Sequence, residues 1–263
     1  MRSTLACDLI FIHVPKCGGR SINDLVTSFL NSNRFSKLTI HGSHIYDNLA
    51  LKNLQDRITE VPYSHVNLIH GHIPINVVER CFNPQTIVTI VRDPIKRFIS
   101  NLFHGINGRD INEIETRLST DDIHVQDNLI TRMWCGKSNA NKPIGSRELE
   151  TAYENLTKSH VRIFSFEDVV ASLPEDYDVM VGTSQMLRDT RGSYDAANLA
   201  ERYYAVARER NFYDCELFER VQSLCIAGSF GKFLAGVPFN QTCNYNFEVN
   251  DLRNSLTISS LVT

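Results

Sequence analysis

The chain has no long run of apolar residues and no grouped cysteines. No stretch approaches the about 18 uninterrupted apolar residues of a membrane-spanning helix, and the first residues lack the charged-then-apolar order of a secretion signal. The seven cysteines are scattered, and no pair has the C-x-x-C spacing. We therefore expect reduced thiols instead of disulfides or a zinc site, a cytoplasmic location and no membrane partner.

Charge of one sign is not in large excess either. The 263 residues include 27 Lys and Arg and 30 Asp and Glu, and the net charge of −3 gives no general attraction to nucleic acid. His41 and His44 have no carboxylate or third ligand nearby, so we expect surface histidines and no metal. The length suits one core, and we expect a domain over 1–229 and a loosely packed tail over 230–263, where Gly, Asn and Ser are frequent.

The stretch after the first few residues is the most informative. The apolar run 9–14 predicts a buried strand, and the pattern over about 20–32 predicts an amphipathic helix. Between them lie Pro15, Lys16, Cys17, Gly18 and Gly19. Free N–H groups at a helix N-terminus, two glycines that allow close approach and a lysine charge together form a cradle for an anion. We predict that a phosphate or sulfate group binds here.

Two common anion-binding motifs do not fit this turn. A nucleoside-triphosphate loop needs G-x-x-x-x-G-K-[ST], whereas Lys16 precedes the glycines and no such string occurs elsewhere. A phosphatase loop of the form C-x5-R fails because the residue six positions after Cys17 is Asn23, and Arg20 would close too short a loop. The turn therefore belongs to another class of anion site.

A second apolar run ends in the sequence H-G-H. Residues 66–69 predict a buried strand, and Pro74 and a short helix follow the two histidines. Alternate residues of an extended backbone face the same side, so His70 and His72 can project together from the strand end. Ligands of parallel sheets bind at such ends. We predict a functional role for the pair, with proton transfer as the typical chemistry of imidazole.

A third run, Thr86–Val91, is rich in β-branched residues, which is typical of a central parallel strand. Asp93 suits the N-cap of the next helix and Pro94 suits its first position. The helical spacing predicts that four apolar residues face the sheet, namely Ile95, Phe98, Ile99 and Leu102. We expect Lys96 and Arg97 on a solvated face, and Arg92 and Ser100 close enough to hold one phosphate.

The remaining segments continue the alternation of strands and helices. We predict a helix over 121–136, a strand entering a helix over 161–169, a short strand and loop over 176–193, and helices over 195–209 and 213–227. Trp134 is expected to pack in the core, and Arg132 to form a surface salt bridge or contact an acidic acceptor. The order of elements predicts an α/β fold with a central, mainly parallel sheet flanked by helices.

Together these motifs resemble the sulfotransferase family. The string P-K-C-G-G-R-S is similar to the P-K-T-G-G-T-S loop that binds the 5′-phosphosulfate in the carbohydrate group, which includes the uronyl 2-O-sulfotransferases. The string R-D-P-x-x-R-x-x-S resembles the family's 3′-phosphate motif, and the same group has H-G-H between the two. The resemblance covers residues 8–227. It implies the P-loop-like sulfotransferase fold and 3′-phosphoadenosine-5′-phosphosulfate (PAPS) as cofactor, with the bisphosphate PAP as product.

The resemblance also implies roles for individual residues. The 5′-phosphosulfate loop comprises Lys16, Cys17, Gly18, Gly19, Arg20 and Ser21, and the 3′-phosphate contacts are Arg92 and Ser100. A Leu-Arg-Asp-Thr string adds Arg188 and Thr190 at the adenosine end. Lys16 and His70, with His72 as second choice, would be catalytic, and no metal is required. The sequence departs from the family at Cys17, where threonine is usual, and at Arg20, where threonine or serine is usual.

Other functions remain open at this stage. A nucleotide or small-molecule kinase would need ATP and Mg²⁺, but this sequence lacks the lysine placement that is usual in kinases. A catalytically silent protein would bind PAP without turnover. The favoured function is transfer of a sulfuryl group to a hydroxyl, or to an amine, of an acceptor. The resemblance implies a carbohydrate acceptor, and a small metabolite fits the slightly acidic composition about as well.

Overall fold

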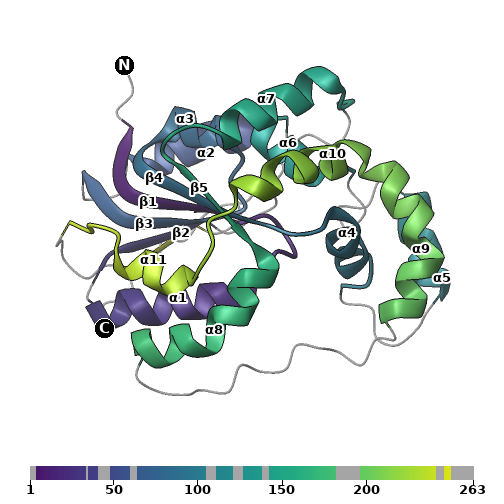
Figure 1. Cartoon of the computed structure of the whole chain (residues 1–263). Coiled ribbons are helices and arrows are strands. Elements are labelled where there is room, and N and C mark those ends of the chain that lie inside the picture. Colours follow the sequence, from purple (N-terminus) through teal and green to yellow (C-terminus); the bar gives the residue numbers. More distant parts are fainter. Residues whose placement is uncertain are drawn as a thin grey trace.

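The fold is organised around a parallel sheet of six strands. In the computed structural model of the chain, the described residues are 4–33, 35–40, 48–59, 64–104, 111–120, 127–137, 142–181, 196–240 and 246–249. The strands are β1 (Leu5–Ile12), β2 (Lys37–Ile40), β3 (His65–Gly71), β4 (Phe82–Val91), β5 (Val161–Ser165) and β6 (Asn246–Val249). Their order is β5-β4-β1-β3-β2-β6, and every neighbouring pair is parallel. The predicted α/β class and parallel sheet are confirmed (Figure 1).

Helices cover both faces of the sheet and one of its ends. The helices are α1 (Gly19–Asn33), α2 (Asn48–Ile58), α3 (Ile75–Cys81), α4 (Pro94–Leu102), α5 (Ile111–Ser119), α6 (Leu129–Cys135), α7 (Ser146–Leu156), α8 (Phe166–Val181), α9 (Ala196–Arg210), α10 (Phe212–Val221) and α11 (Phe230–Ala235), with a short 3-10 helix, η2 (Gln222–Leu224). Figure 1 shows α1, α8 and α11 on one face and α3, α7 and α10 on the other, with α4, α5 and α9 together beyond one end of the sheet. No helix within the described residues is long and apolar enough to cross a membrane.

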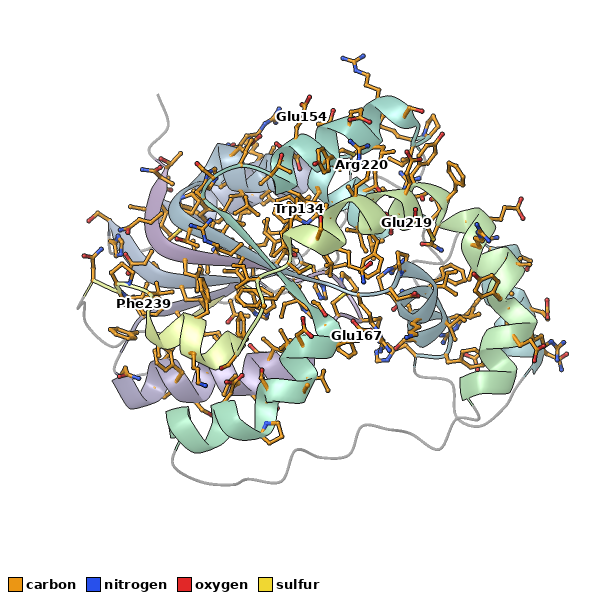
Figure 2. All side chains as sticks on the ribbon, viewed as in Figure 1. Trp134, Glu154, Glu167, Glu219, Arg220 and Phe239 are labelled. Atoms are coloured by element: carbon orange, nitrogen blue, oxygen red, sulfur yellow. The ribbon has the colours of Figure 1, made fainter. Side chains whose placement is uncertain are left out.

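The main core lies between the sheet and these two helical layers. Central strand β1 is buried on both sides, with Leu9, Ile10 and Ile12 fully inaccessible to solvent. Trp134 of α6 is also fully buried, so its predicted role in packing is confirmed (Figure 2). The six described cysteines are free, with Cys17 among the buried ones. The carboxyl ends of these strands lie at one edge of the sheet, and the predicted motifs lie at this edge.

Two sequence-based predictions about helices are wrong. The apolar side of α4 was expected on the sheet, but Phe98 and Leu102 pack with Ile114 of α5 and Tyr203 of α9 in a second apolar cluster. The amphipathic pattern showed that one side is buried but not which element buries it. The short strand expected from residue 176 is also wrong, because α8 continues to Val181.

The segment that was expected to form a loose tail is packed at its start. Phe230 and Leu234 of α11 are fully buried in the main core, and the Phe230 ring lies 5.3 Å from that of Phe164 in β5. Phe230, Phe233 and Leu234 have helical i, i+3, i+4 spacing, a short pattern that the Gly-rich composition masked. The strand β6 adds an edge to the sheet, and residues 250–263 lie outside the described part.

A buried carboxylate attaches the segment after α11 to the sheet. Asp8 is 1% exposed and accepts hydrogen bonds from Asn67 Nδ2 at 2.8 Å, Asn240 N at 3.0 Å and Asn240 Nδ2 at 2.7 Å. Gln85 Nε2 donates to the same carboxylate at 3.1 Å. This network joins β1, β3 and β4 to residue 240, so it stabilises the fold away from the strand ends that carry the motifs.

We predict that Asp8→Ala lowers the free energy of unfolding by about 3 kcal/mol, because buried amide donors lose a charged acceptor. Urea denaturation followed by circular dichroism measures this change. The control Asp24→Ala removes a carboxylate exposed on α1 and should change stability by no more than about 0.5 kcal/mol. Equal midpoints for the two variants would contradict the role of the Asp8 network.

Candidate functional site

The turn after β1 is left-handed at two positions. Lys16 has φ +70° and Gly18 has φ +80°, and the Cys17 amide is hydrogen-bonded within the turn. A side chain at position 18 would bring its Cβ within 2.9 Å of Ile22 Cδ1, so the turn requires glycine. α1 begins at Gly19, which agrees with the predicted helix. The first helical hydrogen bond goes from Ile22 N to the Gly18 carbonyl, so the amides that precede Ile22 have no acceptor within the helix. The main chain therefore has the geometry of an anion cradle.

Cys17 supports this turn from the interior. Its side chain is fully buried, and burial raises the pKa of the thiol to about 12 in spite of smaller opposite effects of Arg97 and Arg92. The thiol therefore remains protonated and lies in the core. Cys17 was predicted as part of the anion-binding loop; its burial leaves only its main chain for such a contact, in agreement with the usual behaviour of free cysteine as a small apolar residue.

Arg92 joins the end of β4 to the same turn. Its Nη1 donates to the Lys16 carbonyl at 3.0 Å, and its guanidinium lies 4.4 Å from the centre of the Phe166 ring. Phe166 also lies against Gly18, because a Cβ at position 18 would meet the ring at 3.1 Å. Arg92 Nε is buried and has no hydrogen-bond partner among the described residues. The structure thus brings the two predicted anion-binding residues, Lys16 and Arg92, into direct contact.

The helix α4 lies beside this turn. Asp93 accepts a hydrogen bond from Lys96 N at 2.8 Å and Pro94 is the first helical residue, so the predicted helix start is confirmed. Lys16 Nζ lies 3.0 Å from His104 Nδ1, just after the helix, and the ammonium is the donor. Ser100 is partly buried in the last turn of α4, and no hydrogen bond among the described residues joins it to the turn after β1, so its predicted role stays a prediction.

Three imidazoles meet at the ends of β1 and β3. His70 is 8% exposed, and its ring is stacked on that of His13, with ring centres 5.6 Å apart and an angle of 17°. The His72 ring lies 4.7 Å from that of His13. The His13 amide donates to the Gly71 carbonyl at 3.0 Å, so the main chain holds His13 beside the H-G-H segment. This cluster is adjacent to Lys16 in the sequence and in space.

Sequence reasoning missed His13 because it was counted within an apolar strand. The signal that identifies it is its position directly after β1, beside the strand that carries H-G-H. Burial lowers the pKa of His13 well below 6.5, and the neighbouring His72, His70 and Lys16 lower it further. His13 is therefore a neutral imidazole at neutral pH.

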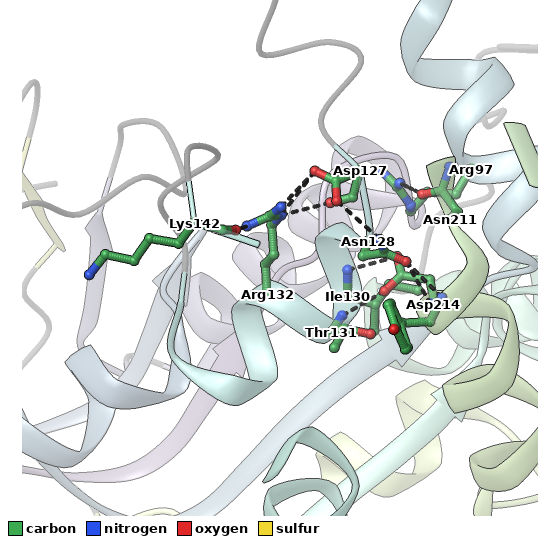
Figure 3. Close-up of polar contacts among 10 residues, drawn as sticks. Arg97, Asp127, Asn128, Ile130, Thr131, Arg132, Lys142, Asn211 and Asp214 are labelled. Atoms are coloured by element: carbon green, nitrogen blue, oxygen red, sulfur yellow. Dashed lines mark hydrogen bonds and ion pairs between the residues drawn. The ribbon is translucent and has the colours of Figure 1, made fainter. Parts of the chain in front are cut away.

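Two arginines that were expected at the surface are buried. Arg97 is 1% exposed, and its Nη2 donates to Asn211 Oδ1 at 2.9 Å. Arg132 is 2% exposed and binds Asp127 Oδ1 at 2.7 Å and the Lys142 carbonyl at 2.7 Å (Figure 3). The helix of Arg97 packs against α9 and α10, which are distant in the sequence, so local spacing did not reveal its burial. For Arg132 the predicted salt bridge is present, but it is formed by a buried side chain.

Several predicted positions fall outside the described residues. His41, His44, Arg188 and Thr190 are among these. Gly19, Arg20 and Ser21 belong to the backbone of α1, and the side chains of Arg20 and Ser21 are outside the described part. The roles expected of these residues stay predictions.

We predict that His13 makes stability depend on pH. The unfolded chain binds a proton at His13 near pH 6.5, whereas the folded protein does not, so the free energy of unfolding should fall as the pH drops below about 6.5, by up to about 1.4 kcal/mol per pH unit. Urea denaturation at a series of pH values measures the slope. His13→Gln should have a smaller slope, and identical slopes for both proteins would contradict a neutral His13.

Comparison with known proteins identifies the family of the chain. No curated protein matches the chain significantly. A family model described as "Sulfotransferase family" matches residues 5–171, more than half of the chain, and the matched span includes Lys16, His70, Arg92 and Ser100. Members of this family are PAPS-dependent enzymes. The chain therefore belongs to the sulfotransferase family.

Proposed function

We propose that this sulfotransferase transfers a sulfuryl group from PAPS to a hydroxyl group of its acceptor, with His70 as general base. The observation that carries the proposal is the hydrogen bond between Arg92 Nη1 and the Lys16 carbonyl, beside the histidine cluster at the ends of β1 and β3. Adjacent strand ends thus hold two cations for phosphate and an imidazole for the acceptor proton. Ligands of parallel sheets bind at such an edge.

The described residues fit the cofactor. Phosphate oxygens need several N–H donors, and the turn offers the amides at the start of α1, the Lys16 ammonium and the buried Arg92 Nε, which has no acceptor among the described residues. Arg92 and Ser100 would hold the 3′-phosphate, which distinguishes PAPS from ordinary nucleotides. When bound, PAPS supplies the sulfuryl group. Arg20, Ser21, Arg188 and Thr190 are proposed contacts on the basis of family resemblance.

Lys16 would act where negative charge increases during the reaction. Sulfuryl transfer should resemble phosphoryl transfer, in which positioning and charge stabilisation matter more than covalent chemistry. The Lys16 ammonium and the amides of α1 can neutralise charge on the departing 5′-phosphate. Lys16 also touches His104, so its side chain is directed across the turn towards α4.

The histidine cluster would remove the proton from the acceptor. His70 is the first choice because it lies next to the last residue of a central strand and is mostly buried, and His72 is the second. His13 is neutral beside both rings, so the cluster is not forced to carry several positive charges at neutral pH. General base catalysis of this kind typically contributes about 10²–10⁴-fold to the rate.

The acceptor belongs to the proposal as well. Resemblance to the uronyl 2-O group favours a carbohydrate, and the net charge of −3 is equally compatible with a small hydroxylated or amino metabolite. We propose a cytoplasmic enzyme without nucleic acid, membrane or metal partners. Incubation with labelled PAPS and a panel of acceptors, followed by mass spectrometry, should reveal a product heavier by one sulfuryl group. PAP binding without any such product would favour a catalytically silent protein.

We predict that Lys16→Ala and Arg92→Ala each weaken PAP binding by about 10- to 100-fold, because each removes a charge-assisted contact to phosphate. Isothermal titration calorimetry measures the dissociation constants. Lys96→Ala removes an exposed cation from α4 and is the matched control, with an affinity close to that of the wild type. Unchanged affinity in both test variants would rule out this binding mode.

We predict that His70→Ala binds PAP like the wild type but loses about 10²–10⁴-fold in turnover. A radiolabelled sulfuryl-transfer assay measures the rate, and calorimetry measures binding. His72→Ala is the comparison that identifies the base. In the wild type, protonation of the base should lower the rate as the pH falls, and only the variant that lacks the base should lose this pH dependence. Full activity of both variants would contradict histidine catalysis.

A further inference from the structure

Lys16 is held by contacts at both ends of the residue. Its carbonyl accepts a hydrogen bond from Arg92 Nη1 at 3.0 Å, and its ammonium donates to His104 Nδ1, also at 3.0 Å. The backbone between these contacts has φ +70°, a conformation that residues other than glycine rarely adopt. Arg92 belongs to the proposed cofactor site, whereas His104 lies outside all of the sequence motifs of that site.

The main chain at His104 is fixed by the neighbouring helices. Arg117 of α5 donates through Nη1 to the His104 carbonyl at 2.7 Å and to the Leu102 carbonyl at 2.9 Å. Phe103, between these two residues, is buried in the second apolar cluster, with its ring 5.9 Å from that of Tyr203 in α9. The His104 imidazole is exposed, but it is therefore attached to a main chain that α5 and α9 hold in place.

The contact with His104 leaves the charge of Lys16 available for an anion. An ammonium has protons but no lone pair, so the contact requires a neutral imidazole with Nδ1 as the acceptor. A carboxylate in the same place would form an ion pair with Lys16 and compete with a phosphate group for it. A neutral imidazole instead directs the ammonium without cancelling its charge. An ammonium has three protons, so it can donate to an imidazole and to phosphate oxygens at the same time.

We propose that His104 is a positioning residue for Lys16, which orders the ammonium beside the turn before the cofactor binds. This inference rests on the proposed binding of PAPS. A lysine side chain is long and flexible, and a ligand that has to order it loses affinity because rotamer freedom is lost on binding. Where His104 has already ordered the side chain, less of this loss falls on the binding step. His104 thus acts through Lys16 and needs no contact with the nucleotide.

Removal of the acceptor should weaken PAP binding. His104→Leu has no acceptor, and we expect a loss of about 5- to 10-fold in affinity by isothermal titration calorimetry, because the ligand must then order the ammonium. His104→Asn keeps a neutral acceptor near the position of Nδ1 and should bind PAP within about twofold of the wild type. His160→Leu is the matched control with unchanged affinity, since His160 directly precedes β5 and lies at the opposite edge of the sheet.

A double variant separates an action through Lys16 from a merely structural role of His104. Lys16→Ala has no ammonium to position, so the addition of His104→Leu to this variant should change PAP affinity by less than about twofold. A structural histidine would weaken binding by the same factor with and without Lys16. Circular dichroism checks that each variant is folded.

Several results would overturn the inference. These are equal PAP affinity for the wild type and His104→Leu, equal losses in His104→Leu and His104→Asn, and an effect of His104→Leu that is the same in the Lys16→Ala background. Tighter binding by His104→Leu would also overturn it, because His104 would then withhold Lys16 from the ligand. Each of these results, with tight PAP binding by the wild type, would leave the proposed function intact, whereas failure of the wild type to bind PAP would overturn both.

Discussion

The contact between Arg92 and the Lys16 carbonyl is the interaction on which the site depends. It is a hydrogen bond from the end of β4 to the turn after β1, and it exists because these strands are neighbours in a parallel sheet. β3 pairs with the other side of β1, which brings the histidines to the same turn from the opposite direction. The turn with Lys16 and Arg92 and the histidine cluster are thus placed side by side by the order of the strands.

Much of this arrangement could be predicted from the sequence. The runs that became β1, β3 and β4, the glycine turn and the Asp93-Pro94 helix start all carry local signals: apolar continuity, left-handed turns and capping. The parallel α/β class follows from the alternation of these elements. Lys16, His70 and Arg92 were predicted because each lies at or shortly after the carboxyl end of a strand, where open sheets bind their ligands.

The rest could not be predicted because it depends on contacts distant in the sequence. Arg97 has the spacing of a solvated residue, and it is buried only because α9 and α10 close over α4 more than a hundred residues later. His13 became part of a cluster only when β1 was placed beside β3. Cys17 occupies a position where the family usually has a hydroxyl, and only its burial shows that the side chain belongs to the core.

The Phe166 ring gives this site an evolutionary constraint. One face of the side chain carries the Arg92 guanidinium, and the ring also fills the space that any side chain at position 18 would need. Replacing the ring with a smaller group would loosen the arginine, whereas the φ of +80° would still require glycine at position 18. Positions 92 and 166 are therefore expected to be epistatic, so that homologues change them together, while position 18 stays glycine.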